Sequence, residues 1–95
     1  MKFSVSLIKS RAIPVLKRYG IRKAAIFGSS ARNERRRGSD IDFVVEMPKS
    51  KSLLDLIGLQ LDLKVEFKTN IDVVTYRSLH PMIRKHVLME QVRII

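Results

Sequence analysis

The chain has 95 residues, with 19 Lys and Arg, 9 Asp and Glu, no Cys and a net charge of +10. This length predicts a single domain over residues 1–95, with one modest core. The missing cysteines exclude disulfides, zinc–thiolate sites and thiol nucleophiles. No apolar run reaches the ~20 residues that span a bilayer, and Lys9 and Arg11 interrupt the N-terminal apolar stretch, so we expect a cytoplasmic protein with no membrane contact.

Residues 4–19 place apolar side chains at helical spacing and so predict an amphipathic helix. Ser4 or Ser6 is expected to cap its start, and Gly20 fits the position just past its end. Pro14 interrupts this pattern, so it marks either a kink or the start of a second helical segment.

Three short apolar runs predict buried strands at residues 23–28, 40–46 and 71–76. Between the first two, residues 29–33 are expected to begin a short helix, and a polar loop follows at residues 34–39. The six aromatic residues lie mostly within apolar runs, where core packing is their expected role.

Residues 53–67 are ambiguous between a strand and a helix. From Ile57 to Phe67 the apolar residues alternate strictly, which is typical of a strand. A polar stripe at helical spacing, with a wide apolar face opposite, favours a helix instead; it consists of Asp55, Gly58, Asp62 and Glu66. A strand of this length would be unusual in so small a domain, so we predict a helix.

Pro81 is expected to begin a last helix that runs to about Glu90, and residues 92–95 predict a short strand. The two histidines, His80 and His86, have no partner at metal-ligand spacing, so surface or structural roles are expected for both. The order of elements predicts a small α/β (α+β) fold in which a mixed sheet packs against helices.

The charge is unevenly distributed along the chain. Residues 1–39 hold 11 basic residues and one acid, Glu34, whereas residues 40–95 hold eight of each sign. Such asymmetry favours a polyanionic partner, which could be the phosphates of a nucleotide, RNA or an acidic protein face. A solvated basic surface is the alternative.

Three aspartates fall on predicted strands and define the candidate catalytic site. Asp40 and Asp42 point to the same side of their strand, and Asp72 joins them if its strand lies beside theirs. Clustered carboxylates repel one another unless a cation neutralises them, and Mg²⁺ is the hard divalent ion best suited to such oxygen ligands. The alternative is a set of strand-edge carboxylates in water or paired with arginines.

A Gly-Ser turn closes the strand that precedes the first two aspartates. Gly28 lets backbone N–H groups approach a phosphate closely, and a helix start behind it favours anions. Ser29 and Ser30 add hydroxyl donors. An ordinary tight turn is the alternative interpretation.

These motifs together resemble the DNA polymerase β-type nucleotidyltransferase superfamily. The matching segments are FGSSAR at residues 27–32, SDIDFVV at residues 39–45 and IDVV at residues 71–74. The short length and the Ala-Arg after the Gly-Ser turn are most similar to the minimal nucleotidyltransferases (MNT), usually antitoxins paired with an all-helical HEPN ribonuclease toxin. The resemblance covers most of the chain.

The resemblance implies roles for these residues. Gly28 and Ser29 would hold a nucleoside triphosphate such as ATP, with Ser30 and Arg32 as further phosphate neighbours. Asp40 and Asp42 would ligate Mg²⁺. Asp72 would be the general base or a further metal ligand. The family pattern often has Gly where Asn33 stands, and the loop at Arg35–Arg37 is unusually basic; it could meet triphosphate, RNA or a partner, or be solvated.

The implied activity is Mg²⁺-dependent transfer of AMP to a hydroxyl of a cognate HEPN toxin, as the antitoxin of a type VII-like pair. A non-catalytic antitoxin that acts by binding alone, and a nucleotidyltransferase or binder acting on RNA, are the alternatives; phosphate contacts would make RNA binding strongly salt-dependent. Leu59 and Leu63 are expected to be exposed apolar positions beyond the needs of a small core, which suggests a homo-oligomer.

Overall fold

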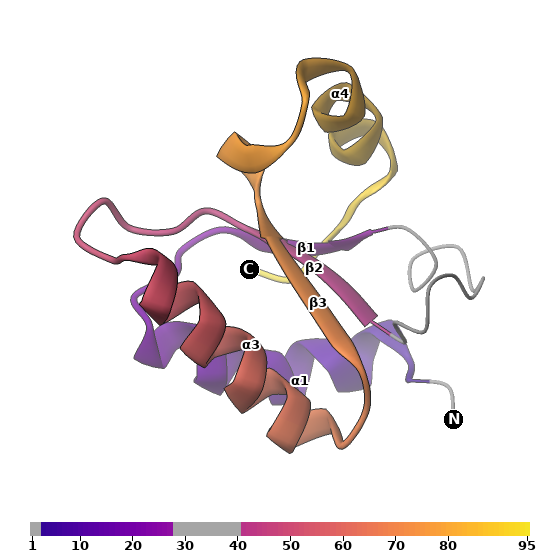
Figure 1. Cartoon of the computed structure of the whole chain (residues 1–95). Helices are drawn as coiled ribbons and strands as arrows, with labels where there is room; N and C mark the ends of the chain where they lie inside the picture. The colour runs from indigo at the N-terminus through magenta and orange to yellow at the C-terminus, as the bar shows by residue number, and fades with distance from the viewer. Residues whose placement is uncertain (1–2, 28–40) are drawn as a thin grey trace.

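The structure is a computed structural model that describes residues 3–27 and 41–95, and Figure 1 shows the chain path. The helices and strands of the described residues are, in chain order, α1 (Val5–Arg18), β1 (Ala24–Phe27), β2 (Ile41–Val45), α3 (Leu53–Phe67), β3 (Ile71–Thr75), the 3-10 helix η1 (Tyr76–Ser78), α4 (Pro81–Glu90) and β4 (Val92–Arg93). The predicted helix over residues 53–67 is confirmed. The helix predicted to begin at residues 29–33 lies outside the described residues.

The four strands form one mixed sheet in the order β3-β2-β1-β4. β1 is antiparallel to both β2 and β4, whereas β2 and β3 are parallel and are connected through α3. Parallel neighbours require a crossover, and α3 supplies it. The folded chain measures 34 × 31 × 22 Å along its principal axes.

Helix α1 begins at the expected cap and ends at the expected glycine. The Ser4 side chain accepts a hydrogen bond from the Leu7 N–H at 3.1 Å, which satisfies one of the free donors of the first turn. Gly20 follows the helix with φ of +73°, a left-handed conformation that glycine adopts without strain. Pro14 lies inside α1, and a single helix continues from Val5 to Arg18 rather than starting again.

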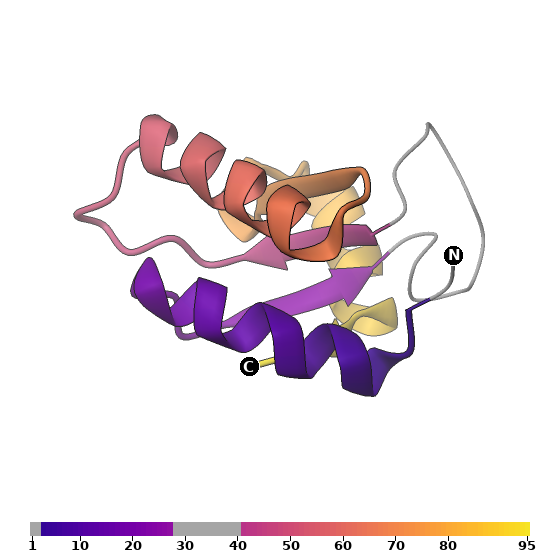
Figure 2. The same ribbon diagram turned by 90° about the horizontal axis from the view of Figure 1, so that it is seen from below.

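Helices α1 and α3 cover one face of the sheet, and α4 covers the other (Figure 1). Seen from below, α1 and α3 lie side by side beneath the strands (Figure 2). Two hydrophobic clusters correspond to these faces. The larger includes Phe43, Leu63 and Phe67 between the sheet and the two helices, and the smaller is formed by Ala25, Val44, Tyr76 and Val87 beneath α4. The sheet therefore has a core on both faces.

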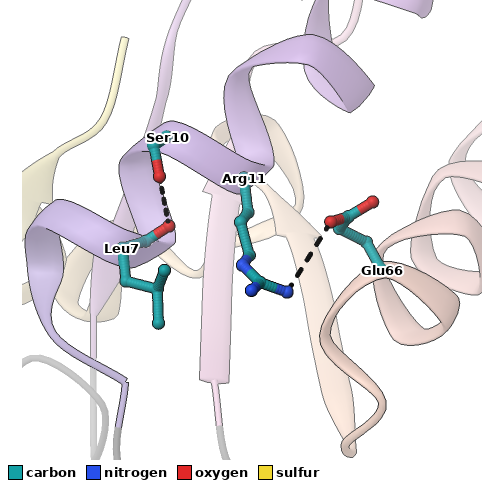
Figure 3. A network of polar contacts seen from close by, with 4 residues as sticks. All are labelled: Leu7, Ser10, Arg11 and Glu66. Atoms are coloured by element: carbon teal, nitrogen blue, oxygen red, sulfur yellow. Dashed lines mark hydrogen bonds and ion pairs between the residues drawn. The ribbon is translucent and has the colours of Figure 1, made fainter.

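The expectation that Leu59 and Leu63 are exposed is wrong. Both are fully buried in the larger cluster, because α3 turns these positions toward the sheet. Two members of the polar stripe of α3, Asp62 and Glu66, make contacts with α1 and its C-cap. The hydroxyl of Tyr19 donates to Asp62 Oδ2 at 2.5 Å, and Arg11 pairs with Glu66 at 4.0 Å. Figure 3 shows the second contact, with Ser10 bonded to the Leu7 carbonyl on the same helix.

Helix α4 is held by polar contacts on its N-terminal side. His80 caps it: its Nδ1 accepts from the Met82 N–H at 3.2 Å, which confirms a structural role for this histidine. Arg84 extends back over η1 and donates to the carbonyls of Tyr76, Arg77 and Leu79 at 2.9, 3.3 and 3.2 Å. The β3–α4 connection is therefore fixed by one guanidinium.

Candidate functional site

Two of the three predicted carboxylates lie directly beside each other in the sheet. In the parallel register of β2 and β3, Asp42 is aligned with Asp72, and Ile41 with Ile71. Aligned residues on neighbouring strands are ~4.8 Å apart in the backbone. The condition under which Asp72 joins Asp42, that their strands lie side by side, is therefore met.

Both carboxylates belong to the α4 face of the sheet. Ile41 and Phe43, which flank Asp42, are buried in the cluster beneath α1 and α3, whereas Val44 belongs to the cluster beneath α4. Side chains alternate along a strand, so Asp42 shares the face of Val44. The same alternation places Asp72 with Val74, which packs against the α4 cluster. Asp42 is partly buried and Asp72 is exposed, so solvent and ligands reach the pair.

Phe27 lies on the other side of Asp42 from Asp72, because it is aligned with Asp42 across the antiparallel β1–β2 ladder. The chain therefore leaves β1 beside the carboxylates and returns to the sheet at Ile41, one residue before Asp42. The predicted triphosphate-binding residues stand in the connecting segment, residues 28–40. Gly28, Ser29, Ser30, Arg32 and Asp40 lie outside the described residues, as does the Arg35–Arg37 loop.

The donor chemistry of the pair fits a hard divalent cation. Two carboxylates on adjacent strands bring like charges together, and such an arrangement is destabilising unless a cation neutralises it. Oxygen-only donors suit Mg²⁺. Within residues 3–27 and 41–95, no group of three or more His, Cys, Asp or Glu side chains could hold a metal ion. Asp42 and Asp72 thus form a two-carboxylate part of a site that the predicted Asp40 would extend.

A cavity of about 640 Å³ lies at the opposite end of the same two strands. Its walls come from the ends of β2 and β3, the loop at residues 46–52, the first turn of α3 and η1. Neither Asp42 nor Asp72 lines it. Tyr76 forms part of the wall; burial raises the pKa of its hydroxyl, which donates to Gln91 Oε1 at 2.6 Å. The sequence motifs did not predict this cavity, because loop and helix ends that are distant in the chain enclose it.

No helix among the described residues is long and apolar enough to cross a membrane.

A nucleotidyltransferase domain model matches residues 10–94. The protein named “Putative protein adenylyltransferase MJ0435” of Methanocaldococcus jannaschii is 42% identical over 97% of this chain and 99% of its own length. “Protein adenylyltransferase MntA” of Thermococcus cleftensis is 33% identical over 92% of this chain and 88% of its own. The family match spans the whole described sheet, including both carboxylate strands.

Solved structures agree with the sequence comparisons. A “putative minimal nucleotidyltransferase” superposes with a TM-score of 0.78 at 32% identity, over 95% of both chains. An MNT antitoxin in complex with a tri-AMPylated Shewanella oneidensis HEPN toxin gives a TM-score of 0.75 at 18% identity, over 97% of this chain and 72% of the matched one, and shows the shared fold.

A mixed sheet with two aligned aspartates on its parallel strands, covered by helices on both faces, defines a nucleotidyl-transfer fold. The chain belongs to the nucleotidyltransferase domain family, as a minimal member of it, and is a nucleotidyltransferase. The resemblance found in the sequence motifs is confirmed.

Proposed function

We propose that this chain transfers the adenylyl group of ATP to a hydroxyl of a partner HEPN toxin and thereby acts as its antitoxin. The observation that carries the proposal is the alignment of Asp42 with Asp72 on adjacent parallel strands of a nucleotidyltransferase fold. The relatives named as protein adenylyltransferases support AMP as the transferred group and a protein as the acceptor. The neighbouring complex of an MNT antitoxin with a tri-AMPylated HEPN toxin supports the partner class.

The proposed roles follow the strand positions. Asp40 and Asp42 would hold Mg²⁺, and Asp72 would be the general base or a further metal ligand. Gly28 and Ser29, with Ser30 and Arg32 beside them, would hold the triphosphate. When bound, Mg²⁺ supplies neutralisation of the charge on the phosphates and the leaving group. Nucleotidyl transfer needs little from the protein beyond such positioning and charge neutralisation. The Asp42–Asp72 pair would contribute to this positioning from the strands β2 and β3 rather than from loops.

The reaction is a displacement at the α-phosphorus of ATP. The acceptor oxygen forms a bond to that phosphorus, the bond to the bridging oxygen breaks, and pyrophosphate leaves. The hydroxyl proton goes to the Asp72 carboxylate, which is exposed and therefore within reach of an incoming acceptor.

The test uses α-labelled ATP, Mg²⁺ and the purified product of the adjacent gene. Label on that product is expected with the wild-type chain, and Asp72→Asn should lower its rate roughly 10²- to 10⁴-fold, the range for loss of a proton-transfer group. Asp42→Asn and Asp40→Asn should also abolish labelling. Glu66→Gln is the matched control, because that carboxylate contacts Arg11 between α1 and α3, away from the pair.

Two results would overturn the proposal. In the first, the complex neutralises the toxin, but neither the wild-type chain nor Asp42→Asn/Asp72→Asn labels the partner. The chain would then be an antitoxin that acts by binding alone. Label on added tRNA, with none on the partner, would make RNA the acceptor.

A further inference from the structure

Helix α3 is apolar on two opposite faces. From residue 57 to residue 67 every second side chain is apolar. On a helix, residues two apart point in nearly opposite directions, since each residue turns by about 100°. The alternation that resembles a strand therefore separates into two stripes. Leu59, Leu63 and Phe67 point into the core, and the residues between them point away from it.

The outward residues form a continuous strip along the helix, which we call the outer stripe: Leu54, Ile57, Leu61 and Val65. Their exposed fractions are 78%, 48%, 55% and 75%. The spacing of three, four and four residues is that of the contact seam between packed helices. A surface helix normally covers its outer face with polar side chains, and a helix that is apolar all round is normally buried. The outer stripe is therefore a face that another molecule covers.

The size of the outer stripe fits a protein partner. Four large side chains at these exposures present on the order of 400–500 Å² of apolar surface, the size of the largest patch on a typical monomer, which is often functional. With a surrounding polar rim this approaches the ~800 Å² per partner of a standard interface. Leu53, also 71% exposed, extends the stripe to the cavity at the start of α3.

The charges beside the outer stripe indicate the chemistry of the partner. Lys51, Lys64 and Lys68 are exposed near its two ends. The acids Asp62 and Glu66 keep their charge but lie on the side of α3 that faces Tyr19 and Arg11, whereas Lys64 and Lys68 fall beside the outer stripe at helical spacing. The surface that remains for a partner is thus basic around an apolar strip. A second copy would bring the same lysines and a further charge of +10, whereas an acidic partner would be attracted.

Helix α3 also packs directly on the strand that carries Asp72. It contacts β3, and the Gln60 side chain accepts a hydrogen bond from the Val73 N–H at 3.3 Å, one residue beyond Asp72. The outer stripe faces away from the sheet and the carboxylate pair lies on the α4 face, so a protein docked on α3 presents its acceptor around the sheet edge that β3 forms. Nucleotidyl transfer requires such a fixed placement of the acceptor.

We propose that the outer stripe of α3 is the docking surface for an amphipathic helix with acidic flanks, carried by the protein that receives the nucleotidyl group. The inference rests on the proposed function for the identity of that protein. The helix would lay its apolar face along Leu54, Ile57, Leu61 and Val65 and place its carboxylates against the lysines.

The test compares two double variants in binding to the purified product of the adjacent gene. Leu61→Ser/Val65→Ser removes the centre of the outer stripe, and we expect the Kd to rise at least tenfold. Met82→Ser/Met89→Ser is the matched control, because these two side chains on α4 are 70% and 76% exposed, and its Kd should stay within twofold of wild type. Circular dichroism melting and binding of a fluorescent ATP analogue should be unchanged in both variants.

Charge complementarity is tested separately. Lys64→Glu/Lys68→Glu should weaken the complex and reduce the dependence of Kd on salt, because acidic flanks of the partner then face carboxylates. An unchanged Kd and salt slope would overturn the acidic chemistry proposed for the partner.

The outcomes separate this inference from the proposed function. Stripe variants that bind and label the partner like wild type would overturn the docking surface and leave the transfer activity intact. A partner that binds through the stripe and is never labelled would confirm the surface and overturn the activity. Light scattering could show that the wild-type chain is a dimer and that Leu61→Ser/Val65→Ser dissociates it. The outer stripe would then bind a second copy of the chain, and the proposed partner would be overturned. A gene product that does not bind the wild-type chain would overturn both.

Discussion

Asp42 and Asp72 are aligned across the parallel strands β2 and β3, with buried apolar residues on either side of each. The flanking residues pack into the core under α1 and α3, so the backbone at both positions is held by packing rather than by the carboxylates. Two like charges at such a position reduce stability and are useful only when a cation or substrate meets them.

Removal of one carboxylate should change stability in opposite directions with and without metal. In EDTA, Asp72→Asn should be up to about 1 kcal/mol more stable than wild type, since one like-charge contact across the strands is relieved. With millimolar Mg²⁺ the melting temperature of wild type should rise more than that of the variant, because ligands that bind only the folded state stabilise it. Differential scanning fluorimetry with a magnesium titration measures both effects. Equal magnesium shifts in the two proteins would show that Asp72 holds no metal.

The contact between Tyr19 and Asp62 should make stability depend on alkaline pH. The hydrogen bond to Asp62 is the main cause that raises the pKa of the Tyr19 hydroxyl above its ordinary value of 10.0. A raised pKa in the folded state means that the contribution is fully present below pH 10 and is lost as the pH rises through the folded value. Tyr19→Phe should cost roughly 1 kcal/mol at pH 7, because solvent competes for this half-buried bond.

Urea unfolding at pH 7 and at about pH 11 measures this contribution, with guanidinium avoided because it screens charge. The difference between wild type and Tyr19→Phe should shrink at the higher pH. A difference that is the same at both values would show that the hydroxyl–carboxylate bond does not contribute to stability.

Gly58 allows Tyr19 to cross α3. A Cβ at position 58 would lie 3.1 Å from the Tyr19 hydroxyl oxygen, while the nearest ring carbons are at 3.7 and 3.8 Å. Alanine is favoured over glycine inside a helix by about 1 kcal/mol, so Gly58→Ala gains propensity and loses part of the Tyr19 contact. In wild type the two effects should nearly cancel. With Tyr19→Phe the crowding atom is gone, and Gly58→Ala should stabilise the chain by about 1 kcal/mol.

A double-mutant cycle of Gly58→Ala and Tyr19→Phe, measured by urea unfolding, gives the coupling between the two positions. The prediction is contradicted if Gly58→Ala has the same effect in both backgrounds.

Arg84 should be necessary for the order of the β3–α4 connection. Its guanidinium donates to three backbone carbonyls, those of Tyr76, Arg77 and Leu79. A hydrogen bond from a charged donor contributes at most ~1.5–3 kcal/mol. The three bonds come from one guanidinium, so their contributions do not add in full, and Arg84→Met should lower the free energy of unfolding by about 2–3 kcal/mol in total. Arg84→Lys should recover only part of this, because one ammonium lacks the planar fork of donors. Thermal melts of both variants check the order of stabilities; equal losses in Met and Lys variants would contradict it.

The local sequence determined most of the elements of this fold. Period and capping signals predicted α1 with its Ser4 cap, α4 after Pro81, and the three strands β1, β2 and β3 with ends within about two residues. Strand periodicity predicted that Asp40 and Asp42 point to one side, whereas the meeting of Asp72 with Asp42 depended on the pairing of β2 with β3, which only the tertiary structure gives.

Only the tertiary structure decided which faces of these elements are covered. The sequence of α3 contains two apolar stripes and one polar stripe, and nothing local says which of them meets the sheet. The packing of α1 beside α3 decides this. Tyr19 contacts Asp62 and Arg11 contacts Glu66, and Leu59 and Leu63 are then buried against the sheet. The outer stripe remains exposed. Periodicity is a property of one segment, whereas burial is a property of its neighbours. That is why the sequence predicted the helix correctly and its exposed leucines wrongly.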